Sequence, residues 1–143
     1  MKNLVSVLAA LCITLALVSP LRAAEKTPDQ LVKEAKAVIK EVSIADVKKM
    51  IDTKANVTIL DVRDKNEVED GKIPGAVNIS RGMLEFKAGM QLPDKTARIV
   101  VYCGLDLRSP LATKTLNDLG YANAVNMAGG LKAWKEAGYP LAK

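Results

Sequence analysis

The segment from Cys103 to Ser109, with the sequence CGLDLRS, combines a nucleophile, a fixed positive charge and a predicted helix start. An apolar run precedes Cys103, and Ser109 followed by Pro110 is typical of a helix opening, with serine as the cap. The first backbone N–H groups of a helix have no partners within the helix, so they favour an anion, and Arg108 adds a positive charge. This arrangement stabilises the thiolate form of Cys103, which is the nucleophile in cysteine chemistry.

The same residues allow a second interpretation, in which Cys103 is a small apolar residue that ends a buried strand. The chain contains no histidine, which excludes Ser-His-Asp triads, Cys-His protease pairs and histidine metal sites. A thiolate stabilised by its local field needs no histidine as a base. The chemistry expected of Cys103 needs neither a metal nor an organic cofactor.

Residues 1–23 have the order of a secretory signal peptide. Lys2 is followed by a fifteen-residue apolar block at 4–18, and then by the small residues Ala23 and Ala24. The block is shorter than the roughly 20 residues of a membrane span, which makes an uncleaved anchor the weaker alternative. We expect cleavage after Ala23 or Ala24, export, and a location in the bacterial periplasm.

Export sharpens the question about Cys103. The chain has two cysteines, and the other, Cys12, lies inside the apolar block and would be lost with it. A single thiol in an exported protein cannot form an internal disulfide, so Cys103 is buried and inert, paired with another molecule, or reactive.

The 120 residues after position 23 suffice for one domain. They carry 19 basic and 16 acidic residues, because Lys2 and Arg22 leave with the signal segment. The resulting net charge of +3 is scattered along predicted helix faces, which indicates a solvated surface and no nucleic-acid partner.

A first helix is expected within residues 24–40, opened by Thr27 as cap, Pro28 in the first turn and Gln30 three residues after the cap. This amphipathic helix either packs on its own domain, which is the simpler case, or docks on a second subunit or partner. Its apolar residues recur at helical spacing and include Leu31, Ala35, Val38, Ile39 and Val42.

Short runs rich in β-branched residues predict strands that are buried on two faces. Strands alternating with helices indicate an α/β fold, with a central parallel sheet and helices on both faces. Ligands of such sheets bind beyond the carboxyl ends of the strands, and Cys103 ends the most apolar one. The strands are expected at residues 57–62, 76–79, 98–103 and 123–127, and further helices at 44–52, 109–120 and 130–138.

Three segments, taken in order, resemble the single-domain rhodaneses, which are sulfurtransferases. LDVRDKNEVEDGKIPGAVNIS at 60–80 is similar to the strand and Gly-His-Ile-Pro-Gly-Ala segment of that family. VVYCGLDLRS at 100–109 resembles its active-site loop, and MAGGLKAWKEAGYPL at 127–141 resembles its closing helix. The resemblance implies a rhodanese-like domain over residues 41–143.

The resemblance also implies roles for the loop residues. Cys103 would take up sulfur as a persulfide, with thiosulfate, polysulfide or a related donor as source and a thiol or cyanide as acceptor. Arg108 would hold an anionic donor, and Asp61 with Arg63 would form an ion pair that supports the loop. The backbone amides that would surround the sulfur belong to Gly104, Leu105, Asp106, Leu107, Arg108 and Ser109.

Loop length favours sulfur transfer over phosphate chemistry. Four residues separate Cys103 from Arg108, whereas related phosphatases and arsenate-handling members have a loop one residue longer, with room for a tetrahedral oxyanion. A sulfur-carrier or protein-binding module without turnover remains the alternative. Leu105 and Leu107 give the loop an apolar rim, which either meets a partner protein or packs within the domain.

Two residues depart from the family pattern. Asp106 replaces a usual glycine and Lys72 a usual histidine. Aspartate tolerates left-handed backbone, so the loop is still expected to curl. Its carboxylate would disfavour a dianion such as thiosulfate, and Lys72 could offset that charge.

Overall fold

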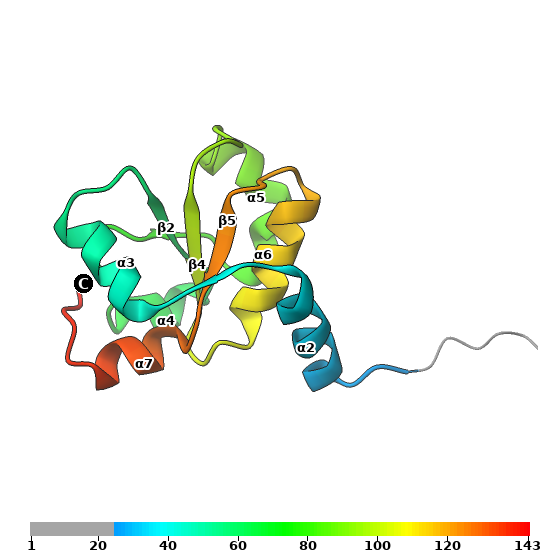
Figure 1. The fold of residues 1–143 in the computed structure, drawn as a ribbon, viewed down its shortest axis with the longest axis horizontal. Helices are drawn as coiled ribbons and strands as arrows, with labels where there is room; N and C mark the ends of the chain where they lie inside the picture. The colour runs from blue at the N-terminus through cyan, green and yellow to red at the C-terminus, as the bar shows by residue number, and fades with distance from the viewer. Residues whose placement is uncertain (1–24) are drawn as a thin grey trace, which may run out of the picture.

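The computed structural model describes residues 25–143, and the predicted signal peptide at 1–23 lies outside the described residues. Its centre is a five-stranded sheet in the order β1-β5-β4-β2-β3, in which every neighbouring pair is parallel. This confirms the expected α/β fold with a central parallel sheet (Figure 1). The strands are β1 (Glu41–Val42), β2 (Thr58–Asp61), β3 (Val77–Asn78), β4 (Ile99–Tyr102) and β5 (Ala124–Met127).

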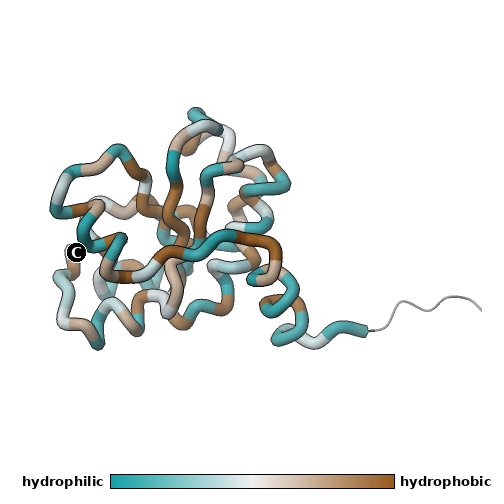
Figure 2. Tube along the Cα trace, in the orientation of Figure 1, coloured by the Kyte–Doolittle hydropathy of each residue, from teal (hydrophilic) through white to brown (hydrophobic). Residues whose placement is uncertain are grey.

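Helices cover both faces of the sheet, as Figure 1 shows. Because successive side chains of a strand point to opposite faces, Leu60 and Val101 contribute to one core and Ile59 and Val100 to the other. The apolar residues gather along the strands (Figure 2). The helices are α2 (Pro28–Val38), α3 (Ile44–Asp52), α4 (Lys65–Glu69), η1 (Arg81–Met83), α5 (Leu84–Gln91), α6 (Arg108–Asp118) and α7 (Gly130–Glu136).

The N-terminal helix α2 begins as the sequence predicts. The backbone N–H of Gln30 donates to Thr27 Oγ1 at 3.2 Å, and the Thr27 N–H donates to Gln30 Oε1 at 2.8 Å. The helix packs on α6 of the same chain, which is the simpler of the two alternatives. Ala35 is its buried contact, whereas Leu31 and Val38 are exposed.

Several short elements carried too weak a pattern to be expected. The edge strand β1 has two residues, α4 has five, and the segment from η1 to α5 mixes apolar and polar positions. The described helices include none that is long and apolar enough to cross a membrane.

Candidate active site

Cys103 follows the last residue of β4 in the middle of the sheet, and only 1% of its surface is exposed. It packs in the same core as Ala112 and Leu116 of α6. The backbone N–H of Ser109 donates to its sulfur, with an N···Sγ distance of 3.4 Å. The thiol is therefore buried, as the apolar interpretation requires, yet it also receives a backbone donor from a helix start.

The helix α6 starts two residues earlier than the sequence predicts. Leu107 is the cap and makes no side-chain capping bond, so Ser109 and Pro110 are the second and third helical residues. The expected serine cap is therefore wrong. The Ser109 side chain is fully buried and its N–H is one of the free donors of the first turn, so it reaches Cys103 Sγ instead of opening the helix.

Asp106 adopts left-handed backbone with φ of 61°, in line with the tolerance expected of aspartate. Its carboxylate does not stand free. Oδ2 accepts from Lys36 Nζ at 2.5 Å and from the Gly129 N–H at 3.1 Å, and Oδ1 accepts from Asn126 Nδ2 at 2.8 Å. The cation paired with Asp106 is thus Lys36, whereas Lys72 forms a backbone bridge with Ala142 near the C-terminus.

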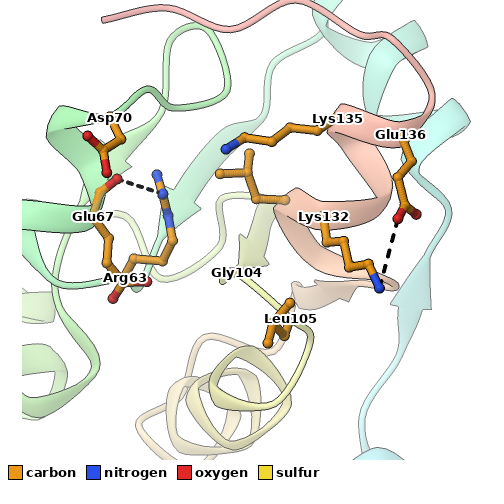
Figure 3. Close-up of a pocket in the computed structure, with 9 residues that line it drawn as sticks. Arg63, Glu67, Asp70, Gly104, Leu105, Lys132, Lys135 and Glu136 are labelled. Carbon is orange, nitrogen blue, oxygen red and sulfur yellow. Dashed lines mark hydrogen bonds and ion pairs between the residues drawn. The ribbon is translucent and has the colours of Figure 1, made fainter.

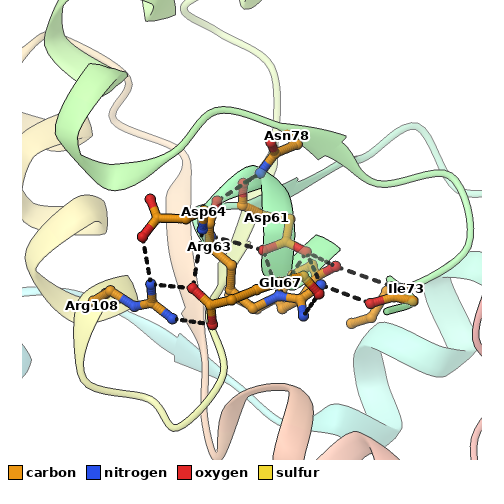
Figure 4. Close-up of polar contacts among 9 residues, drawn as sticks. Asp61, Arg63, Asp64, Glu67, Ile73, Asn78 and Arg108 are labelled. Carbon is orange, nitrogen blue, oxygen red and sulfur yellow. Dashed lines mark hydrogen bonds and ion pairs between the residues drawn. The ribbon is translucent and has the colours of Figure 1, made fainter. Parts of the chain in front are cut away.

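Arg108 is held by a carboxylate that the sequence did not single out. Its Nη1 and Nη2 each donate to Glu67 of α4 at 2.7 Å, and Asp64 lies 3.6 Å from Nη1 (Figure 4). The hydrogen bond from Arg108 lowers the pKa of Glu67 to about 2 from an ordinary value of 4.5, and the same bond raises the pKa of Arg108. The expected anion-binding guanidinium therefore has a carboxylate partner.

Asp61 and Arg63 form the expected ion pair at the end of β2. Arg63 Nη2 donates to Asp61 Oδ2 at 2.6 Å, and Tyr102 donates its hydroxyl to the same oxygen at 2.7 Å. Burial and the Asp61 charge raise the pKa of Tyr102. Because Tyr102 directly precedes Cys103, this pair fixes the strand end from which the loop departs.

Arg63 also joins the pair to the segment that follows α4. It donates to the carbonyl oxygens of Glu67 and Gly71, each at 2.8 Å (Figure 4). The Tyr102 hydroxyl in turn accepts from the Ile73 N–H at 3.1 Å. These hydrogen bonds thus fix the end of β4, from which the loop departs, relative to the backbone at Glu67.

The start of α7 packs directly on the loop. The N–H groups of Leu131 and Lys132 donate to the carbonyls of Cys103 and Gly104, at 2.8 and 3.0 Å. Gly130 has φ of 61°, and a Cβ there would lie 2.8 Å from the Cys103 carbonyl oxygen. The glycine is required because the two backbones approach too closely for a side chain.

A hollow of about 470 Å³ lies beside the loop, between α4 and α7. Figure 3 shows Lys135 reaching across it from α7 toward the α4 side. Cys103 is not among its lining residues, so the hollow adjoins the outer face of the loop. Charges of both signs line it, and the lining residues are Arg63, Glu67, Asp70, Gly104, Leu105, Leu131, Lys132, Lys135 and Glu136.

Within residues 25–143, no cluster of three or more cysteine, aspartate or glutamate side chains could hold a metal ion, and Cys103 forms no disulfide. Glu67 and Lys36 are the functional candidates that sequence reasoning missed. Asp64 and Glu67 have capping-box spacing, and the Asp64 N–H does donate to Glu67 Oε2 at 3.2 Å. That signal predicts a helix start, not the partner of Arg108.

Comparison with known proteins agrees with this geometry. Residues 43–137 match the model of the rhodanese-like domain. The Bacillus subtilis protein YtwF is 37% identical over 97 residues, covering 68% of this chain and 91% of its own. The thiosulfate sulfurtransferase GlpE of Shewanella oneidensis is 31% identical over 98 residues, covering 68% of this chain and 94% of its own.

Among solved structures, RPA3614 of Rhodopseudomonas palustris superposes with a TM-score of 0.77 and 34% identity, covering 85% of this chain and 98% of its own. It is a protein of unknown function for which tyrosine phosphatase activity has been suggested. The family match spans more than half of the chain and includes the whole loop around Cys103. The chain therefore belongs to the rhodanese-like domain family, as a single-domain sulfurtransferase.

Proposed function

We propose that the protein moves sulfane sulfur from thiosulfate or a related donor to a thiol or cyanide acceptor, through a persulfide on Cys103. The observation that carries this proposal is the placement of Cys103 at a central strand end, where its sulfur accepts a backbone hydrogen bond from Ser109. Anionic sulfur at that place meets the free donors of a helix start.

The proposed reaction has two displacements. The Cys103 thiolate attacks the outer sulfur of thiosulfate, the S–S bond of the donor breaks, and sulfite leaves with the bonding electron pair. An acceptor thiolate or cyanide then attacks the outer sulfur of the Cys103 persulfide, which regenerates the thiolate and releases a persulfide or thiocyanate. No electron acceptor is needed, because sulfur passes from one nucleophile to another.

The loop amides are the proposed stabilisers of the persulfide anion. In the described part of the chain, no group accepts a hydrogen bond from the N–H groups of residues 104–108. Ser109 Oγ is also buried without a hydrogen-bond partner among the described residues, so its hydroxyl is a further donor for the added sulfur. Preorganised donors of this kind stabilise developing anions without reorganisation.

Arg108 is the proposed contact for the anionic part of the donor. Its guanidinium is held by Glu67, and both side chains are about one-third exposed. An incoming dianion can therefore compete with the Glu67 carboxylate for Arg108. The donor that binds best is the one whose attraction to Arg108 outweighs the loss of the Arg108 ion pair with Glu67.

A hydrolase and a sulfur carrier are two other candidate functions, and each would treat Cys103 differently. A hydrolase, as suggested for RPA3614, would turn over a phosphate ester and would leave Cys103 without sulfur. A sulfur carrier would load Cys103 and release the sulfur only to a particular protein, for which exposed Leu105 and Leu107 are the proposed contact. The four-residue spacing from Cys103 to Arg108 favours sulfur over phosphate.

Intact mass spectrometry tests the proposal. After incubation with thiosulfate, the protein should gain one sulfur atom, and added cyanide should remove it with formation of thiocyanate. The Cys103→Ser variant should gain none. Hydrolysis of a phosphate ester by a protein that takes sulfur from neither thiosulfate nor polysulfide would overturn the proposal, and loading without turnover would favour the carrier.

Export through residues 1–23 forms part of the proposal. The apolar block and the small residues Ala23 and Ala24 support it. N-terminal sequencing of the protein from a bacterial periplasmic extract should give a first residue of Ala24 or Glu25. A full-length chain in the cytosolic fraction would contradict export.

A further inference from the structure

We propose that Lys36, on the N-terminal helix α2, is a positioning residue of the active loop, an inference that deepens the proposed sulfur transfer and rests on it. Lys36 Nζ donates to Asp106 Oδ2 at 2.5 Å across 70 residues of sequence. Asp106 is the loop residue with left-handed backbone. The contact therefore ties α2 to the curl of the loop that carries Cys103.

The surroundings of Asp106 support a specific role for this contact. Its side chain is only 12% exposed, and it also accepts from Asn126 Nδ2 and from the Gly129 N–H. Both of those donors are neutral, and Lys36 is the cation within ion-pair distance of this carboxylate among the described residues. Lys36 thus neutralises a nearly buried negative charge within the loop whose amides surround the Cys103 sulfur.

The electrostatics of Lys36 agree with this assignment. Burial lowers its pKa, but the hydrogen bond and charge of Asp106, together with Glu41 at 3.4 Å, outweigh burial and raise it above the ordinary value. Lys36 therefore stays charged at neutral pH. Its side chain is about one-third exposed, and its ammonium group pairs with two carboxylates, those of Asp106 and Glu41.

Lys36 lies on a helix that precedes the rhodanese-like domain in the chain. The family match starts at residue 43, so Lys36 and the rest of α2 lie outside the matched domain. Asp106 has left-handed backbone and a nearly buried carboxylate, and α2 supplies the cation that pairs with it. The helix is thus a part of the active-site frame and not only a cover for α6.

Loss of the Lys36 charge should slow the reaction of Cys103 with an anionic reagent more than its reaction with a neutral one. An unpaired Asp106 carboxylate repels anions, and the Coulomb energy is proportional to the charge of the approaching group. A neutral reagent of the same shape should hardly respond. Damage to the fold, in contrast, would slow or speed both kinds of reagent together.

Iodoacetate and iodoacetamide provide this matched pair, since they alkylate the same thiol and differ by one negative charge. Rates are followed on the Cys103 peptide by mass spectrometry. Lys36→Met should lower the ratio of the iodoacetate rate to the iodoacetamide rate by about threefold, and the thiosulfate kcat/KM by about tenfold, mainly through KM, because thiosulfate carries two charges.

Three further variants make the test specific. Lys36→Arg should keep the wild-type rate ratio, because it retains the charge. Adding Asp106→Asn to Lys36→Met should restore the ratio, because it removes the nearly buried carboxylate that Lys36 neutralises within the loop. Lys33→Met removes a neighbouring exposed cation of α2 and should change nothing.

An unchanged ratio in Lys36→Met, or an equal loss with both reagents, would overturn the inference. Alkylation does not depend on sulfur transfer, so it tests Lys36 even if the protein fails to take sulfur from any donor. That failure would overturn the proposed function alone.

Discussion

The ion pairs beneath the active loop and at its mouth each join an arginine to a carboxylate but differ in burial. Beneath the loop, the side chains of Asp61 and Arg63 are 0% and 5% exposed, and every guanidinium nitrogen of Arg63 donates to a protein oxygen. At the mouth, Glu67 and Arg108 are 35% and 36% exposed. A desolvated pair cannot separate without a large free-energy penalty, whereas a pair that is one-third exposed can exchange one partner for a ligand.

The largest expected effect comes from breaking the buried pair. Arg63→Met leaves the Asp61 carboxylate buried without its cation, and we expect the free energy of unfolding to fall by about 3–5 kcal/mol. Urea denaturation measures the change. Lys114→Met, which breaks an exposed pair with Asp118, should cost less than about 1 kcal/mol. Equal losses in the two variants would contradict the comparison.

A second change tests the backbone beneath the loop. Gly130→Ala places a Cβ 2.8 Å from the Cys103 carbonyl oxygen and 2.9 Å from the Asp106 nitrogen. Because both atoms belong to backbone, the loop must shift, and sulfur loading should fall by at least about tenfold, with a stability loss of about 1–3 kcal/mol.

Gly138→Ala is the matched control for Gly130→Ala. Both glycines have positive φ, of 70° and 61°, but a Cβ at Gly138 meets nothing within 4 Å. The control therefore reports backbone strain alone and should retain wild-type loading. If both variants loaded sulfur equally well, the close approach of α7 would have no part in shaping the loop.

The sequence predicted the parts of the site that depend on local pattern. Apolar runs place β2 and β4, and the end of β4 places Cys103 at the carboxyl end of the central strand. The start of α6 was misplaced, because Ser109 has the local chemistry of a cap while its burial beside Cys103 decides its actual position. A capping preference of about 1 kcal/mol is readily outweighed by burial.

The partners of the loop residues could not be predicted, because they lie far away in sequence. Glu67 is 41 residues from Arg108, and Lys36 is 70 residues from Asp106. The sequence shows the charge of each such residue, but the fold decides with which oppositely charged residue it forms an ion pair. The Asp61 and Arg63 pair was expected because both residues stand at the end of one strand, and the family resemblance places them at the same end of the sheet.

Removing the Glu67 charge at the mouth of the loop should have a smaller effect than the two changes above, and the effect should be on substrate binding. Glu67→Gln keeps a hydrogen-bond acceptor near Arg108 but removes the charge that competes with an anionic donor. The KM for thiosulfate should fall by about threefold. Steady-state kinetics measures it, with Glu85→Gln as control, because Glu85 pairs with Arg81 in a similarly exposed contact. A raised KM would mean that Glu67 positions Arg108 for the donor instead of competing with it.

The smallest expected effect is the acid dependence of stability at the mouth. The pKa of Glu67 is lowered in the folded protein to about 2 from an ordinary 4.5, by the hydrogen bond from Arg108. Its contribution is therefore fully present above the ordinary value and is lost as the pH falls from 4.5 toward 2. Because the pair is one-third exposed, the contribution should be below about 1 kcal/mol.

Comparison of wild type with Glu67→Gln by urea denaturation isolates this contribution. Wild type should be the more stable protein near pH 6, and the difference should shrink as the pH approaches about 3, where protonation of Glu67 in the unfolded chain competes with the pair. Arg63 donates to the backbone carbonyl of Glu67, and its charge adds less to the lowered pKa of the Glu67 carboxyl than the hydrogen bond from Arg108 does. A difference that stayed constant with pH would show that Glu67 stabilises the mouth through packing, and that the contrast in burial does not extend to charge.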